Sequence, residues 1–208
     1  MRSPDNSIME NLELFFINQM QEHSMIVERC RQSLLEPFIS TVKICTDCVS
    51  SGNKILFFGN GGSASDAQHL STELTVRFSK NRKAIAAVSL STDTSTLTAI
   101  GNDLGFEFIF SRQIEAIGSA GDVALGISTS GKSKNVINGL STARDLGLKT
   151  IALSGKDTTY LSKVCDKVIS IPANNTSRIQ EMHIFIGQMI CNAIESNLGL
   201  SKLVEEEK

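Results

Sequence analysis

The sequence predicts a three-layer α/β domain, in which a five-stranded parallel sheet is flanked by helices and preceded by a pair of N-terminal helices. Three observations lead to this class. The 208 residues suffice for one domain with a sizeable core, and 41% of them are apolar, an ordinary globular value. The first 52 residues are amphipathic at helical spacing. Beyond them, short apolar runs alternate with amphipathic segments in a strand-then-helix rhythm.

The N-terminal segment predicts two helices, over residues 7–31 and 34–51. Ser7 and Glu10 form a capping box at the start of the first helix, and Gly52 ends the second. The two helices can form an antiparallel pair. Because one small sheet cannot cover both apolar stripes, we expect residues 1–52 to serve in oligomerisation and residues 53–200 to form the α/β core of a single domain.

Five apolar runs predict parallel strands buried on both faces. The strands are expected over residues 54–59, 84–90, 122–128, 149–154 and 167–171, and helices over residues 63–78, 93–101, 106–118, 132–146 and 177–198. In such a sheet, ligands bind beyond the carboxyl ends of the strands. We therefore expect the functional residues in the turns that follow the first three strands.

Charge, hydropathy and cysteine usage exclude several function classes. The net charge of -2 argues against a nucleic-acid binder with a broad basic surface. No apolar run reaches the roughly 18 residues of a membrane span, and the N-terminus lacks a secretory pattern, so we expect a cytoplasmic protein without membrane partners. The five scattered cysteines, including a Cys45-x-x-Cys48 pair in a helical segment, are expected to be ordinary buried thiols.

Two loops after predicted strands have the features of anion sites. Residues 59–63 (GNGGS) bring three glycines to the start of a helix, where the backbone can approach a ligand closely. Residues 128–133 (STSGKS) gather hydroxyl and N–H groups at the start of another helix. We expect both loops to face one pocket and to bind a phosphate.

The second loop also matches the nucleotide-binding P-loop pattern, from Gly126 to Gly131, Lys132 and Ser133. A P-loop enzyme needs an acidic residue at the end of a neighbouring apolar strand to help hold magnesium. The candidate strands end in Ser154 and Ile171 instead. Nucleotide binding is therefore not expected.

Protonatable side chains follow the first loop. His69 and Glu73 lie four residues apart on a predicted helix, so they share a face and can hold a metal or supply a base. Residues 178–183 add polar groups near the start of the last helix, whereas Asn102 and Asp103 alone indicate a helix-ending turn. A phosphorylated ligand beside a carboxylate and an imidazole suits proton transfer next to a carbonyl, as in aldose–ketose isomerisation.

Four motifs (GNGGSASDAQHLSTEL, AIGND, GISTSGKS and RIQEMH), in this order, resemble the phosphoheptose isomerases of the SIS superfamily, and the resemblance covers essentially the whole chain. It implies a homotetramer with active sites at subunit interfaces, which converts sedoheptulose 7-phosphate to D-glycero-D-manno-heptose 7-phosphate for bacterial lipopolysaccharide or capsule. It implies one Zn²⁺ per subunit, with Glu73 as general base. The implied metal ligands are His69, Glu73, Gln180 and the residue at position 188. The expected substrate contacts are Asn60, Gly61, Gly62, Ser63, Glu73, Asn102, Asp103, Ser128, Thr129, Ser130, Ser133 and Gln180.

The chain departs from this family at Gln188, where similar members carry a histidine that serves as metal ligand and general acid. We therefore expect weakened zinc affinity and poor turnover. His183 lies five residues away, about 140° around a helix, and should point elsewhere. The related replication-initiator-associating proteins, which bind a protein partner and do not catalyse, are the alternative. In those proteins the metal and base positions are degraded, whereas this chain keeps His69, Glu73 and Gln180 and an intact GNGGSASDA loop.

Overall fold

The computed structural model describes residues 4–201, and the predicted fold class is confirmed there. One parallel sheet has the strand order β2-β1-β3-β4-β5. The strands are β1 (Ile55–Gly59), β2 (Ala87–Ser89), β3 (Val123–Ser128), β4 (Lys149–Ser154) and β5 (Lys167–Ser170). The α-helices are α1 (Pro4–Ser33), α2 (Leu35–Ser50), α3 (Gly62–Thr75), α4 (Thr94–Asp103), α5 (Ser111–Ile117), α6 (Lys134–Asp145) and α7 (Thr176–Asn197).

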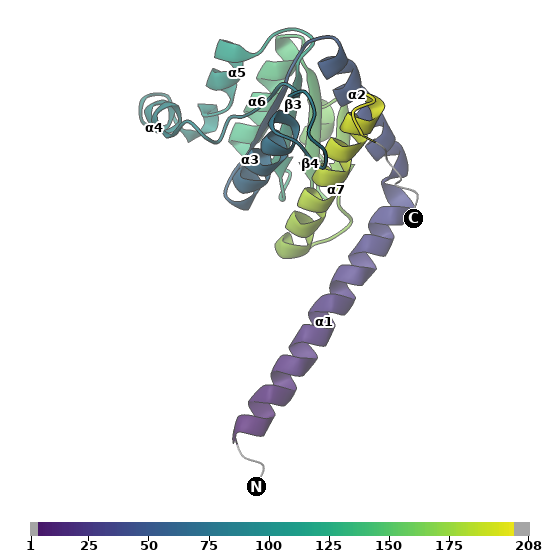
Figure 1. The fold of residues 1–208 in the computed structure, drawn as a ribbon. Coiled ribbons are helices and arrows are strands. Elements are labelled where there is room, and N and C mark those ends of the chain that lie inside the picture. Colours follow the sequence, from purple (N-terminus) through teal and green to yellow (C-terminus); the bar gives the residue numbers. More distant parts are fainter. Residues whose placement is uncertain (1–3, 202–208) are drawn as a thin grey trace.

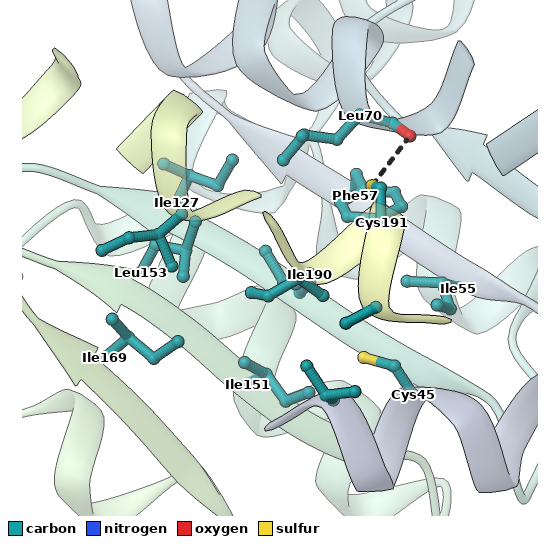
Figure 2. Packing of buried hydrophobic residues seen from close by; sticks show 14 of the residues in the cluster. Cys45, Ile55, Phe57, Leu70, Ile127, Ile151, Leu153, Ile169, Ile190 and Cys191 are labelled. Atoms are coloured by element: carbon teal, nitrogen blue, oxygen red, sulfur yellow. Dashed lines mark hydrogen bonds between the residues drawn. The ribbon is translucent and has the colours of Figure 1, made fainter. Parts of the chain in front are cut away.

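Helices cover both faces of the sheet (Figure 1). Successive residues of a strand point to opposite faces. On one face, Phe57 and Leu125 pack with α2, α3 and α7 in a cluster that includes Leu70 and Ile190 (Figure 2). On the other face, Phe58 packs with α5 and α6. Since all five strands run parallel, their carboxyl ends share one edge of the sheet, and the loops expected to carry function lie along it.

The two N-terminal helices do not form the antiparallel pair that was expected. They follow one another with a bend at Leu34, and α1 projects away from the α/β body (Figure 1). Pro37 lacks the N–H that would bond to Ser33, so the helix bends there but does not reverse. The first helix begins at Pro4, earlier than the predicted residue 7, because proline is well suited to the first turn of a helix.

Three other expected elements differ from the prediction. The segment 106–118 is a 3₁₀ turn, Phe106–Phe108, followed by α5, because Asn138 and Ser111 bond the carbonyls of Glu107 and Phe108 that would continue a helix. The predicted strand 84–90 shortens to β2. Its first part turns away, since the N–H of Ile85 bonds to Leu74 on α3. The helix expected over 63–78 ends at Thr75.

The described helices include none that is both long and apolar enough to cross a lipid bilayer. All five cysteines are free, four of them buried and Cys165 half-buried. Burial raises the pKa of the Cys48 thiol to about 11, so this thiol stays protonated at neutral pH. The prediction of ordinary thiols is confirmed for Cys45 and Cys48, which are both buried.

Candidate active site

The first candidate loop joins β1 to α3 and is shaped by its glycines. A side chain at Gly59 would collide with the carbonyl oxygen of Ile127 on the neighbouring strand. Gly61 has a φ of +56°, which favours glycine, and stands directly before α3 without a side-chain cap. The loop therefore brings bare backbone to the positive end of a helix, an arrangement that suits an anion.

The second candidate loop joins β3 to α6. Gly131, with a φ of +66°, closes a tight turn by donating its N–H to the Ser128 carbonyl over 3.1 Å. The Ser128 hydroxyl donates to that of Ser133 over 3.0 Å, and Ser130 accepts from the N–H of Lys132. Ser133 precedes α6 but makes no side-chain cap. Capping therefore does not explain why a serine stands there, and its hydroxyl is oriented into the loop with Ser128.

The P-loop pattern in this segment has a structural origin. Gly126 is buried in the middle of β3, where an added Cβ would lie 2.9 Å from Val136 of α6 and 3.1 Å from Phe58. This glycine allows close packing between helix and sheet, at a distance from the loop that would cradle a nucleotide.

The two loops are joined directly by a pair of amides. Asn60 donates to the side-chain oxygen of Asn135 over 2.8 Å, and Asn135 donates back to Asn60 over 2.9 Å. Asn135 is buried in the first turn of α6 and also accepts from the N–H of Val136. Sequence reasoning missed this residue. Its position two residues after the STSGKS loop was the available signal.

His69 and Glu73 lie together on α3 as predicted. The imidazole Nε2 and the carboxylate Oε1 are 2.9 Å apart, and the Glu73 side chain is the more enclosed of the two. Asp66, in the first turns of the same helix, has its pKa raised by burial. The helix therefore carries an imidazole and two carboxyl groups within three turns of the glycine loop.

Helix α7 lies beside α3, and the contacts between them follow one order along both helices. A Cβ added at Gly62 would meet the Gln180 amide at 2.7 Å, and one added at Gly187 would meet Leu70. The helices thus run parallel, and Gln188 lies at the level of His69 and Glu73. The structure brings Gln180 against the first loop, and Gln188 is half-buried two turns further along α7.

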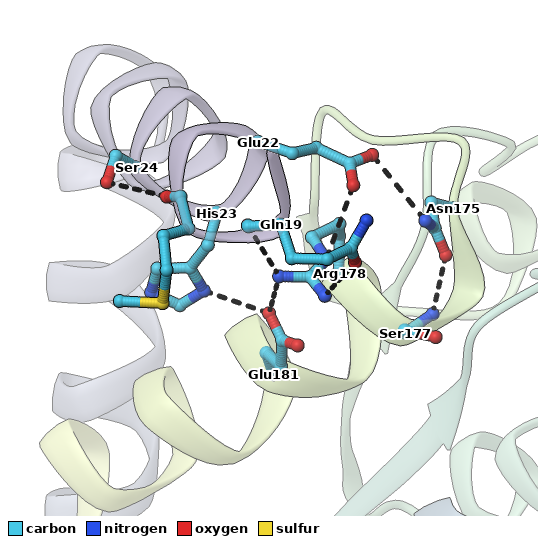
Figure 3. Close-up of polar contacts among 9 residues, drawn as sticks. Gln19, Glu22, His23, Ser24, Asn175, Ser177, Arg178 and Glu181 are labelled. Carbon is cyan, nitrogen blue, oxygen red and sulfur yellow. Dashed lines mark hydrogen bonds and ion pairs between the residues drawn. The ribbon is translucent and has the colours of Figure 1, made fainter. Parts of the chain in front are cut away.

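The other polar groups near the start of α7 face different surroundings. Arg178 and Glu181 point toward α1, where Arg178 contacts Glu22 and Gln19, and Glu181 lies 2.8 Å from His23 Nδ1 (Figure 3). His183 is completely buried near the Ser154 backbone of β4. Its imidazole is therefore enclosed in the core beside β4.

Asn102 and Asp103 end α4, which lies at the periphery of the domain (Figure 1). Both are exposed, and Asn102 donates to Asp103 over 2.7 Å. Within the described part of the chain, the structure does not bring them to the two loops. A hollow of about 620 Å³ between β2, α4 and α5 is lined by none of the candidate residues.

A second hollow, of about 520 Å³, opens beside the 128–133 loop. Its lining includes Thr129, Ser130, Lys156 and Asn174. Its rim is fixed by an exposed ion pair, in which Lys132 Nζ is 2.9 Å from Asp157 and its hydrogen bond holds the pKa of that carboxyl at about 2. This hollow offers donors and positive charge at the open side of the second loop.

Comparisons with known proteins agree on one family. The SIS domain family matches residues 18–155. The phosphoheptose isomerase of Paramagnetospirillum magneticum is 50% identical to this chain over 182 residues, which cover 88% of the chain and 95% of the relative. The phosphoheptose isomerase of Aliarcobacter butzleri is 47% identical over 183 residues, which cover 88% of this chain and 97% of that relative. The structure of phosphoheptose isomerase GmhA from Neisseria gonorrhoeae has a TM-score of 0.84 at 40% identity, covering 89% of this chain and 99% of that one.

Proposed function

The chain belongs to the phosphoheptose isomerase family of SIS-domain proteins, and we propose that it converts sedoheptulose 7-phosphate to D-glycero-D-manno-heptose 7-phosphate. The single observation that carries this proposal is the amide pair of Asn60 and Asn135. It joins two anion-directed loops next to a helix that bears an imidazole and a carboxylate. The non-catalytic alternative is not favoured, because full-length relatives at close to 50% identity are isomerases.

The phosphate group is assigned to the space between the two loops. The positive ends of α3 and α6 both point there, and two helix N-termini together offset much of the charge of a phosphate dianion. The hydroxyls of Ser128, Thr129, Ser130 and Ser133 supply further donors. Gly61 and Gly62 let the backbone reach the phosphate oxygens, and Ser63 lies buried directly behind them.

Glu73 is assigned the role of general base. Its carboxylate takes a proton from carbon 1 of the ketose and returns it to carbon 2, while a proton moves from the oxygen on carbon 1 to the oxygen on carbon 2. His69 holds the carboxylate by the hydrogen bond between them. Gln180, against the glycine loop, is in place to orient the sugar hydroxyls near the reacting carbons.

The donor set on α3 and α7 fits one zinc ion, held weakly. An imidazole and a carboxylate one helical turn apart are ordinary zinc ligands. The amide oxygens of Gln180 and Gln188 on the neighbouring helix would complete the set. A zinc ion there would polarise the carbonyl oxygen of the substrate. Two amide ligands bind zinc less strongly than histidine does, so low affinity is expected.

A homotetramer in the cytoplasm, serving lipopolysaccharide or capsule synthesis, completes the proposal. Large apolar side chains of α1 are exposed on the isolated chain: Ile8, Met9, Leu12, Phe15, Phe16 and Met20. Burying such a stripe between subunits would stabilise an assembly. The exposed Asn102 and Asp103 support active sites shared between chains, since they would reach a substrate most easily from a neighbouring subunit.

The test is a coupled isomerase assay with sedoheptulose 7-phosphate, with and without zinc, on the chain itself and on Gln188→His. An imidazole at position 188 restores a group that can ligate zinc and transfer a proton, so we expect turnover to rise about a hundred- to ten-thousand-fold. Met189→His is the matched control, because position 189 lies about 100° further around the helix. Equal rates for Gln188→His and the unmodified chain would contradict the proposed chemistry.

A further inference from the structure

Arg82 lies between α3 and β2, outside the site described above, and its guanidinium is almost completely enclosed. Its side chain is 2% exposed. Nη2 donates to the carbonyl of Glu73 over 2.7 Å, and Nη1 donates to that of Leu74 over 2.6 Å. Arg82 thus covers the carboxyl end of α3, where backbone carbonyls lack partners and a positive charge is favourable.

The same guanidinium is anchored to α7 through Glu195. Nη2 and Nε of Arg82 lie 2.6 and 2.7 Å from Glu195 Oε1, and the N–H of Phe78 donates to that oxygen over 2.8 Å. Glu195 is fully buried, and its other oxygen has no hydrogen-bonding partner in the described part of the chain. A buried ion pair with one unsatisfied oxygen stabilises the fold poorly, because apolar residues would fill the same space without the cost of desolvating two charges.

The position of this pair along the helices suggests its purpose. Helices α3 and α7 already touch where Gly62 meets Gln180 and where Leu70 meets Gly187. Arg82 adds a third link at the far end, and it bonds the backbone carbonyl of Glu73 itself. The planar fork of arginine can hold a carboxylate and two carbonyls at once, which a lysine ammonium cannot do in the same geometry.

We propose that Arg82, held by Glu195, is a positioning residue that fixes the turn of α3 carrying Glu73 against α7, so that the base stays aligned with the reacting carbons. The inference rests on the proposed role of Glu73. Misplacing a catalytic group by about 1 Å can cost about a hundred-fold in rate. Arg82 is far from the phosphate loops, so substrate binding should be unaffected.

The experiment compares Arg82→Lys, Glu195→Gln and a control, Asp122→Asn. Asp122 is also buried and paired, with Lys54 at 2.6 Å, but its carboxylate bonds to Lys54 and Ser119 beside β1 and β3 and does not join α3 to α7. Turnover is measured per folded molecule, at a temperature where circular dichroism shows each variant fully folded. We expect kcat to fall at least about ten-fold for Arg82→Lys and at least about three-fold for Glu195→Gln, with KM within two-fold. Asp122→Asn should keep kcat within two-fold.

Two further measurements separate positioning from stability. In a Glu73→Asp background the base is already displaced. There Arg82→Lys should lower kcat by less than about three-fold, because the effects of two coupled residues do not add. Amide hydrogen exchange should accelerate at residues 73–76 in Arg82→Lys but not in Asp122→Asn. Three results would each overturn the inference. They are an unchanged kcat in Arg82→Lys, an equal loss of kcat with glutamate and with aspartate at position 73, and unchanged exchange at residues 73–76. Absence of turnover in both the unmodified chain and Gln188→His counts instead against the proposed function, and the exchange result still decides whether Arg82 fixes this turn.

Discussion

Burial of His183 should make the stability of this protein fall in mild acid. The imidazole is fully buried, and burial lowers its pKa from 6.5 to about 4. The folded state therefore keeps it neutral, while the unfolded chain binds a proton below pH 6.5. Stability from this group is complete above pH 6.5 and is lost as the pH falls toward 4. The difference corresponds to about 3 kcal/mol at pH 4, from 1.36 kcal/mol per pKa unit.

The assay is urea unfolding at pH 7, 5.5 and 4 at constant ionic strength. Carboxyl groups also titrate in this range. The informative quantity is therefore the difference in the free energy of unfolding between the unmodified chain and His183→Met, in which an apolar side chain of similar length replaces the imidazole. Between pH 7 and pH 4, the free energy of unfolding should fall by about 3 kcal/mol less in His183→Met than in the unmodified chain. His23→Gln, which removes a partly exposed imidazole, is the control and should leave the loss much as it was. An identical pH dependence in the chain and in His183→Met would refute the reasoning.

Three other predictions concern the proposed site and assembly. Glu73→Gln should reduce turnover at least about a thousand-fold in the isomerase assay while sugar phosphate still binds by calorimetry, because glutamine keeps the shape but cannot accept a proton; retained activity would exclude Glu73 as the base. Asn135→Leu should raise the calorimetric Kd for the sugar phosphate about ten-fold, since it breaks both bonds to Asn60, whereas an unchanged Kd would mean that the loops are held by other contacts. Replacing Phe15 and Phe16 by aspartate should convert the proposed tetramer to smaller species in light scattering, and a monomer before substitution would contradict the proposed assembly.

The sequence predicted the parts of this fold that depend on local pattern and missed those that depend on distant contacts. Apolar runs identified every strand of the described sheet, although the edge strands β2 and β5 are only partly buried. The glycines at 59–62 correctly marked a strand–helix turn. The break within residues 106–118 depends on Asn138, which belongs to another helix. The bend at Leu34 was readable from Pro37, but the direction taken by α1 was not, because tertiary packing decides it.

The same division explains the candidate site. His69 and Glu73 share a face of one helix, so their spacing alone brought them together, as the 2.9 Å contact confirms. Asn135 and Arg82 act on residues far from them in sequence, and no local period reveals such partners. Residues that join elements were therefore missed, although they fix the geometry of those that were predicted.

The two halves of the proposed site depend on different parts of the fold, and this bears on how a substitution at position 188 acts. The phosphate half is formed by loops joined through Asn60 and Asn135, near the first turn of α3. The proton-transfer half lies further along the helix and requires α7 beside it. Because Gln188 lies on α7 eight residues beyond Gln180, which adjoins the glycine loop, its effect should appear in kcat and zinc affinity, while phosphate affinity stays at the level of Gln188→His. The arrangement thus predicts that the chain binds its substrate without efficient turnover. If kcat and phosphate affinity were both reduced to the same extent relative to Gln188→His, the two halves would form one cooperative unit.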